Sequence, residues 1–166
     1  MKLLIVTQIV DPEDYVFGFF YGHILDLANT YEQVQVLCLE HRGGDLPANV
    51  TVVSLGKESN PDPSQLQYLR HFYSFLFFKS KPYDTVLIHM EPLYVLLGGW
   101  WWRLSGKKLV LWYNHIYRDG KLSLASSFVN AIIGVSKKTI PVSHSRIELI
   151  RHDRDLTSIM REISSS

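Results

Sequence analysis

The sequence has a single cysteine, no long apolar run and almost no net charge, and each of these absences excludes something. With only Cys38 in 166 residues, a disulfide framework is excluded and a reducing compartment fits. No segment approaches the roughly 18–20 apolar residues of a transmembrane helix. The formal net charge is +1, and without a concentrated basic face we expect no nucleic-acid partner.

The N-terminus lacks the features of a secretory signal. Lys2 is followed by four apolar residues before Thr7, whereas a signal peptide has an apolar region of about 7–15 residues. We therefore expect a cytoplasmic protein. The aromatic and basic residues described below leave open a peripheral position at the inner face of a membrane.

The first apolar run is not followed by the glycine motif of dinucleotide-binding folds. That motif, Gly-x-Gly-x-x-Gly, follows the first strand directly, whereas nine residues separate Gln8 from Gly18. A nicotinamide-binding fold is therefore disfavoured, although a nucleotide-binding Rossmann protein of another kind is kept as an alternative. Gly18 itself has two interpretations, since it would let a ligand approach the start of a helix or simply ease the packing of that helix.

Short apolar runs alternate with helical patterns along the chain. Continuous apolar runs are typical of strands covered on both faces, as in parallel sheets. The predicted strands are 3–7, 34–39, 50–54, 85–89, 109–113 and 131–135. The sequence therefore predicts an α/β fold with a single Rossmann-like, doubly wound, mostly parallel sheet and helices on both of its faces.

Two helical segments carry more aromatic residues than one buried face needs. In the helix after residue 92, the spacing predicts Trp100 in the core stripe and Trp102 and Val95 on the opposite side. The segment 68–81 also carries aromatic residues around most of its circumference, with basic residues interspersed, and further basic residues follow the tryptophans of the other helix. Such surfaces suit a membrane interface or a protein partner. The alternative is that the domain covers both faces itself.

Polar, titratable residues follow two of the predicted strands. His89 closes the run 85–89, and Asn114 and His115 follow the run 109–113. Carboxyl ends of parallel strands meet at one edge of a sheet, where ligands bind, so both histidines could bind a polar ligand or relay a proton. No third ligand with metal-like spacing accompanies them, and no metal site is predicted. Glu91 and Pro92 suit the cap and first turn of the next helix.

Three stretches resemble, in order, the N-terminal domain of family 4 glycosyltransferases. They are Lys2-Leu3-Leu4-Ile5-Val6-Thr7-Gln8 with Phe17-Gly18-Phe19-Phe20, residues 83–90 continued by 94–99, and residues 106–115. The resemblance implies a GT-B fold of two facing Rossmann-like domains. Residues 1–145 would form the acceptor-side domain, and residues 146–166 a remnant interdomain strand with a short C-terminal helix or tail.

The resemblance also implies roles for individual residues. His115 would be the catalytic residue, and Gly18, His89, Glu91 and Asn114 would bind the acceptor. The family normally works without a catalytic metal. The complete enzyme would use a nucleotide sugar held mainly by a second domain, which these 166 residues do not include. The chain alone is therefore expected to bind no cofactor and to be inactive.

The leading hypothesis is thus the acceptor-binding half of a GT-B glycosyltransferase. Its expected partners are a donor-binding glycosyltransferase domain or subunit, a lipid-linked acceptor or membrane surface, and a second copy of the chain in a homo-oligomer. The alternative is a non-catalytic binding or scaffold protein that kept the fold and interacts through its aromatic and basic surfaces.

Overall fold

In the part of the chain that the structure describes, the sheet has seven strands, all parallel, and every predicted apolar run forms one of them. The computed structural model describes residues 1–59, 64–116, 120–151 and 154–166. The sheet order is β3-β2-β1-β4-β5-β6-β7, which confirms the predicted α/β, Rossmann-like fold class. The strands are β1 (Lys2–Val10), β2 (Gln33–His41), β3 (Val50–Ser54), β4 (Thr85–His89), β5 (Lys108–Trp112), β6 (Ala131–Gly134) and β7 (Ile147–Leu149).

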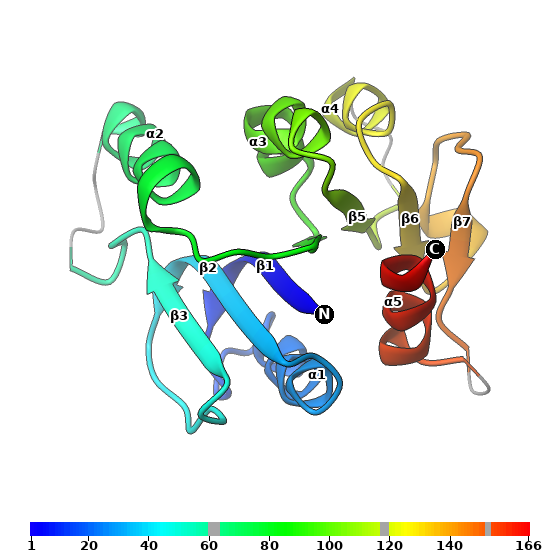
Figure 1. The fold of residues 1–166 in the computed structure, drawn as a ribbon. Coiled ribbons are helices and arrows are strands. Elements are labelled where there is room, and N and C mark those ends of the chain that lie inside the picture. Colours follow the sequence, from blue (N-terminus) through cyan, green and yellow to red (C-terminus); the bar gives the residue numbers. More distant parts are fainter. Residues whose placement is uncertain (60–63, 117–119, 152–153) are drawn as a thin grey trace.

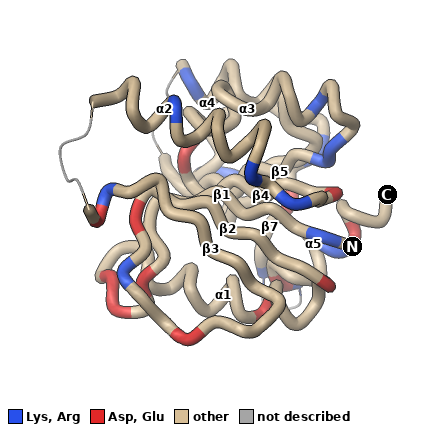
Figure 2. Tube along the Cα trace, turned by 60° about the vertical axis from the view of Figure 1, so that its left-hand side comes forward, with Lys and Arg blue, Asp and Glu red and all other residues tan. Residues whose placement is uncertain are grey.

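Helices cover both faces of this sheet. In Figures 1 and 2, α1 (Gly18–Ala28) and α5 (Leu156–Ser165) lie on one face, and α2 (Gln65–Ser74), α3 (Pro92–Leu104) and α4 (Gly120–Ala125) lie on the other. A π-helical turn, η1 (Phe75–Lys79), continues α2, and a short 3₁₀ turn, η2 (Lys137–Thr139), follows β6. Within the described ranges, no helix combines the length and apolarity needed to cross a bilayer.

The helix starts follow the capping chemistry of the sequence. The Ser64 side chain accepts the Gln67 amide at the start of α2, and Glu91 accepts the Leu93 amide at 3.0 Å with Pro92 as the first residue of α3. Asp155 accepts the Ser158 amide at 2.7 Å and begins α5. These side chains satisfy amides that a helix leaves unpaired, which fixes where each helix begins.

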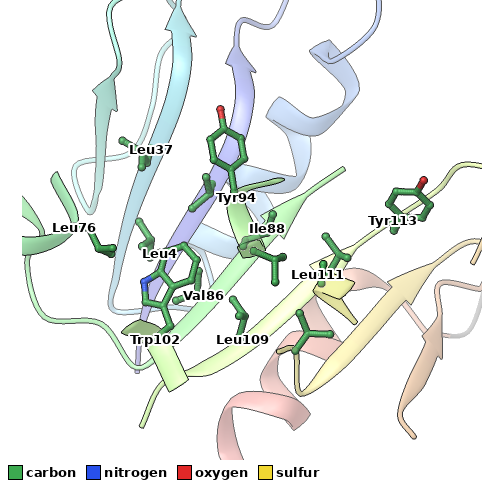
Figure 3. Close-up of a cluster of buried hydrophobic side chains, with 14 of the residues drawn as sticks. Leu4, Leu37, Leu76, Val86, Ile88, Tyr94, Trp102, Leu109, Leu111 and Tyr113 are labelled. Carbon is green, nitrogen blue, oxygen red and sulfur yellow. The ribbon is translucent and has the colours of Figure 1, made fainter. Parts of the chain in front are cut away.

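The predicted face of α3 is wrong. Val95 and Trp102 are fully buried, whereas Trp100 is 43% exposed. Figure 3 shows Trp102 in the apolar cluster between the sheet and the α2–α4 layer, close to Leu4 and Val86. The helix is apolar on nearly all sides, so periodicity alone did not decide which side faces the sheet.

The side of α3 that faces away from the sheet therefore carries part of an exposed aromatic surface. Phe77 of η1 contacts Trp100 and Trp101 of α3 there, with the Phe77 ring 5.0 Å from that of Trp101, and Phe78 packs edge-on against Phe77. Lys79, Lys81 and Arg103 are exposed around them. We call these seven residues, together with the exposed Leu104, the aromatic–basic surface.

Candidate functional site

The sheet topology places one crevice at its carboxyl edge. The chain builds β2 and β3 on one side of β1 and the remaining strands on the other side, beginning with β4. Connections that leave β1 and β4 therefore run to opposite sides, and ligands of open α/β sheets bind at such a switch point. Gln8 of β1 and Met90, directly after β4, border this crevice.

A pocket of about 370 Å³ opens in the crevice, and we call it the site pocket. Its volume lies within the range of about 300–1,000 Å³ that is usual for small-molecule sites. The polar and charged side chains in its wall are Gln8, Lys57, Glu91 and His115, and the apolar ones include Phe17, Phe19 and Leu39. A glutamine, an ammonium, a carboxylate and an imidazole can donate and accept hydrogen bonds to a ligand rich in hydroxyl groups.

The residue before Glu91 has an unusual backbone conformation, and Glu91 follows it in the pocket wall. Met90, the residue before it, has a φ of +66°, the only positive φ outside glycine among the described residues. Its amide donates to the Trp112 carbonyl at 2.8 Å, which ties this turn to β5. A side-chain-bearing residue in this region stores strain, commonly at functional sites. The turn brings the Glu91 carboxylate to the start of α3 and to the pocket at once.

His115 lies in the pocket wall with an exposed side chain. The ring contacts Tyr113 edge-on at 5.4 Å. Asn114 does not line the pocket, and its Oδ1 atom is buried without a hydrogen-bond partner among the described residues. Of this predicted pair, the structure therefore brings only His115 to the pocket.

Gly18 begins α1 beside the pocket but does not line it. A Cβ atom at this position would lie 2.9 Å from the Pro12 carbonyl oxygen, so the glycine allows a close approach of the preceding loop. The Asp14 carboxylate accepts the Val16 and Phe17 amides at 2.9 and 2.7 Å, and the Gly18 amide donates to the Asp14 carbonyl. Since Asp14 already occupies this end of the helix, the geometry favours the packing interpretation of Gly18.

The hydrogen bonds from these amides also change Asp14 itself. The hydrogen bond from the Phe17 amide lowers the pKa of Asp14 below its ordinary value. Burial of the carboxyl acts in the opposite direction, whereas the Val16 amide and Arg42 lower the pKa further. The carboxylate is therefore charged at neutral pH and repels a second anion at the start of α1. This loop differs in that respect from one that cradles a phosphate.

His89 lies beneath the pocket and is fully buried. Its Nδ1 atom is 3.0 Å from the Thr7 hydroxyl oxygen, and its ring stacks on Phe20 with centroids 3.7 Å apart. Phe17 and Phe19, which line the pocket, pack edge-on against the same ring at 6.0 and 5.7 Å. His89 is thus placed to support the pocket wall rather than to touch a ligand.

Burial sets the protonation of this histidine. Loss of solvation, together with the nearby His23, lowers the pKa of His89 from 6.5 to about 3. The imidazole is therefore neutral in the folded chain at any physiological pH. Between pH 6.5 and 3 the unfolded chain binds a proton here that the folded chain does not, so stability falls as the pH falls through this window.

We expect this single site to lower the free energy of unfolding by about 3 kcal/mol between pH 7 and pH 4. Urea unfolding at the two pH values measures the change. His89→Leu removes the titrating ring and should flatten that part of the pH dependence, even though the variant is less stable at pH 7. Thr7→Val is the matched control, because it removes the hydrogen bond and keeps the ring. An unaltered pH dependence in His89→Leu would contradict the assignment.

The sequence did not single out four pocket residues, namely Gln8, Phe17, Phe19 and Lys57. The signal available for Gln8 and Lys57 was their position near strand ends, since Gln8 lies two residues before the end of β1 and Lys57 three residues after the end of β3. Phe17 and Phe19 flank Gly18, to which the family resemblance gave a role in acceptor binding. The part of the chain that the structure describes holds no group of three or more His, Cys, Asp or Glu residues arranged to bind a metal ion.

Comparison with known proteins adds the fold family. No protein-family model matches the sequence, and no curated protein matches it either. Among solved structures, HepE (Alr3699) of Anabaena in complex with UDP matches with a TM-score of 0.54 and 14% identity, over 90% of this chain and 43% of that one. The lipopolysaccharide outer core galactosyltransferase WaaB matches with a TM-score of 0.56 and 11% identity, over 90% and 45%. The fold is GT-B-like.

A third similar structure is an epimerase. The UDP-GlcNAc 2-epimerase from Methanocaldococcus jannaschii matches with a TM-score of 0.54 and 12% identity, over 90% of this chain and 45% of that one. This chain thus spans less than half the length of each of these three solved structures. Identities this low show the GT-B-like fold and leave substrate and partner to be argued from the site.

Proposed function

We propose that this chain is the acceptor-binding half of a family 4 type glycosyltransferase, and that a separate domain or subunit supplies the nucleotide sugar. The observation that carries the proposal is the site pocket at the switch point of a GT-B-like sheet, with Glu91 and His115 in its wall. One similar structure holds UDP, another is a galactosyltransferase, and a third acts on UDP-GlcNAc. UDP-sugars are therefore the first donors to test.

In this proposal the pocket residues divide the work of holding an acceptor. The Glu91 carboxylate accepts a hydrogen bond from an acceptor hydroxyl, and Gln8 both donates and accepts. The exposed imidazole of His115 takes the proton as the hydroxyl attacks the donor sugar. Occupation of the α1 start by Asp14 leaves the donor phosphates to the other domain, in agreement with an acceptor-side role.

Reconstitution tests the proposal. The chain is mixed with, or fused to, the donor-binding domain of a GT-B glycosyltransferase such as WaaB, and UDP-sugars are supplied with a panel of hydroxyl acceptors. We expect UDP release together with a glycosylated acceptor detected by mass spectrometry, and neither product from the chain alone or the donor domain alone. A donor domain that binds its UDP-sugar but transfers to no acceptor when paired with this chain would contradict the proposal.

The aromatic–basic surface supports a second candidate, a non-catalytic binding protein that docks on a membrane. Phe78 is 85% exposed and Leu104 is 80% exposed, and exposed lysine and arginine side chains around them suit anionic lipid. The two roles are compatible, because a lipid-linked acceptor would also bring the chain to a membrane. Failed reconstitution combined with flotation on phosphatidylglycerol vesicles would favour the non-catalytic role.

A further inference from the structure

A second pocket, of about 400 Å³, lies between the first turns of α2 and α3, and we call it the α2–α3 pocket. The surface of its wall is mostly apolar, although Gln8, Gln65 and Glu91 also line it. The leucine and phenylalanine side chains in this wall are Leu39, Leu55, Leu69, Phe72, Leu93 and Leu97. Leu69, Leu93 and Leu97 each remain partly exposed to solvent. A ligand that covers them removes their apolar surface from water, which favours binding.

The walls of this pocket are fixed by hydrogen bonds and ring packing. His71 of α2 bonds through Nδ1 to the Leu55 carbonyl at 2.9 Å, which holds the helix to the end of β3. The Tyr73 hydroxyl donates to the Leu97 carbonyl at 3.1 Å and joins α2 to α3. Beneath, the buried rings of Phe72 and Tyr94 lie 5.9 Å apart at an angle of 21°. Because the cavity is preformed, binding a ligand in it requires no further ordering of the protein, which would cost free energy.

The α2–α3 pocket shares a wall with the site pocket. Gln8, Leu39 and Glu91 line both. The shared lining combines two polar side chains, Gln8 and Glu91, with the apolar side chain of Leu39. A ligand with a polar end in the site pocket can place an apolar end between the two helices.

We propose that the α2–α3 pocket binds the hydrocarbon tail of an amphiphilic acceptor whose hydroxyl-bearing head lies in the site pocket. The proposal rests on the proposed function and specifies its substrate class. A hydrocarbon chain fits better than a polar group, because Glu91 is the only charged residue among the described ones that line this wall, and it also lines the site pocket. The aromatic–basic surface lies further along the same two helices, where Tyr73 stacks on Phe77.

Alkyl glycosides test this without a donor domain. Binding of D-glucose and of hexyl, octyl and decyl β-D-glucopyranoside, each below its critical micelle concentration, is measured by titration calorimetry on the whole chain. We expect no measurable binding of glucose and an affinity that rises about fourfold for each added methylene, the factor that corresponds to about 0.8 kcal/mol per buried CH₂. An affinity that does not depend on tail length would overturn the proposal.

Three variants locate the tail. Leu69→Gln and the rim variant Leu93→Gln should weaken decyl glucoside binding at least tenfold. Leu66→Gln is the matched control, because Leu66 is on the same helix, is 74% exposed and does not line the pocket. Wild-type affinity in both pocket variants, with a native circular dichroism spectrum, would place the tail elsewhere and refute the proposal. These binding results do not depend on transfer, so they separate this proposal from the proposed function.

Discussion

Replacing Trp102 by alanine is expected to lower the free energy of unfolding by about 3–5 kcal/mol, because the substitution leaves a large cavity in the core. The indole is fully buried between α3 and the sheet and packs edge-on against Phe72. Its Nε1 atom donates to the Tyr83 hydroxyl at 2.9 Å. The variant therefore loses apolar burial and also the hydrogen bond to a largely buried hydroxyl, which adds to the cost.

The neighbouring tryptophan provides the matched control. Trp100→Ala removes a side chain that is 43% exposed and should cost about 1 kcal/mol or less, as is usual for surface positions. Chemical denaturation of the two variants at pH 7 gives both free energies of unfolding. Equal losses, or a larger loss for Trp100, would mean that the opposite side of α3 faces the sheet.

The sequence did contain a signal for the buried side of this helix. Gly98 and Gly99 are buried, and a Cβ atom on Gly98 would lie 2.6 Å from the Trp102 ring. Gly99 allows a similarly close approach by Phe128, at 3.2 Å. Glycine inside a helix costs about 1 kcal/mol relative to alanine and is usually retained for packing. The glycine pair marks the packed face, whereas the leucines, which occur on every side, do not.

The fold class was predictable because strands that are buried on both faces are continuous apolar runs in the sequence. All five residues of β4 and all four of β6 are buried, as their continuous apolar runs predicted. The short α4 was not predicted, because six residues span less than two helical turns and show no period. Residues 156–165 form the helix α5, on which Ile159, Met160 and Ile163 are all buried.

The sequence placed both histidines at the carboxyl edge of the sheet, but it did not show which of them lines the site pocket. His89 is the last residue of β4 and is therefore enclosed by neighbouring strands and α1. His115 lies three residues beyond the end of β5, and its side chain is exposed. The two histidines look alike in sequence, since each follows an apolar run. Whether such a residue is inside or outside the sheet depends on a strand boundary that sequence patterns place only to within a few residues.

His115→Ala is expected to lower kcat/KM about 10²–10⁴-fold in the reconstituted reaction, the usual contribution of a general base. The reason is its position: it is the exposed imidazole in the wall of the site pocket, whereas His89 is neutral and buried. Initial rates over a range of acceptor concentrations measure kcat and KM separately. His115→Gln keeps a hydrogen-bonding side chain and should retain an acceptor KM near that of the wild type while kcat stays low.

The next residue supplies the control for this variant. Ile116 is 64% exposed and does not line the pocket, so Ile116→Ala should retain wild-type kinetics if the loop itself is unimportant. A His115→Gln variant with normal kcat and a raised KM would instead assign His115 to binding the acceptor, and proton transfer would then fall to Glu91. Wild-type kinetics in both His115 variants would remove this residue from the site altogether. The separate effects on kcat and KM thus test whether His115, which lies just beyond the buried strand β5, acts in the site pocket.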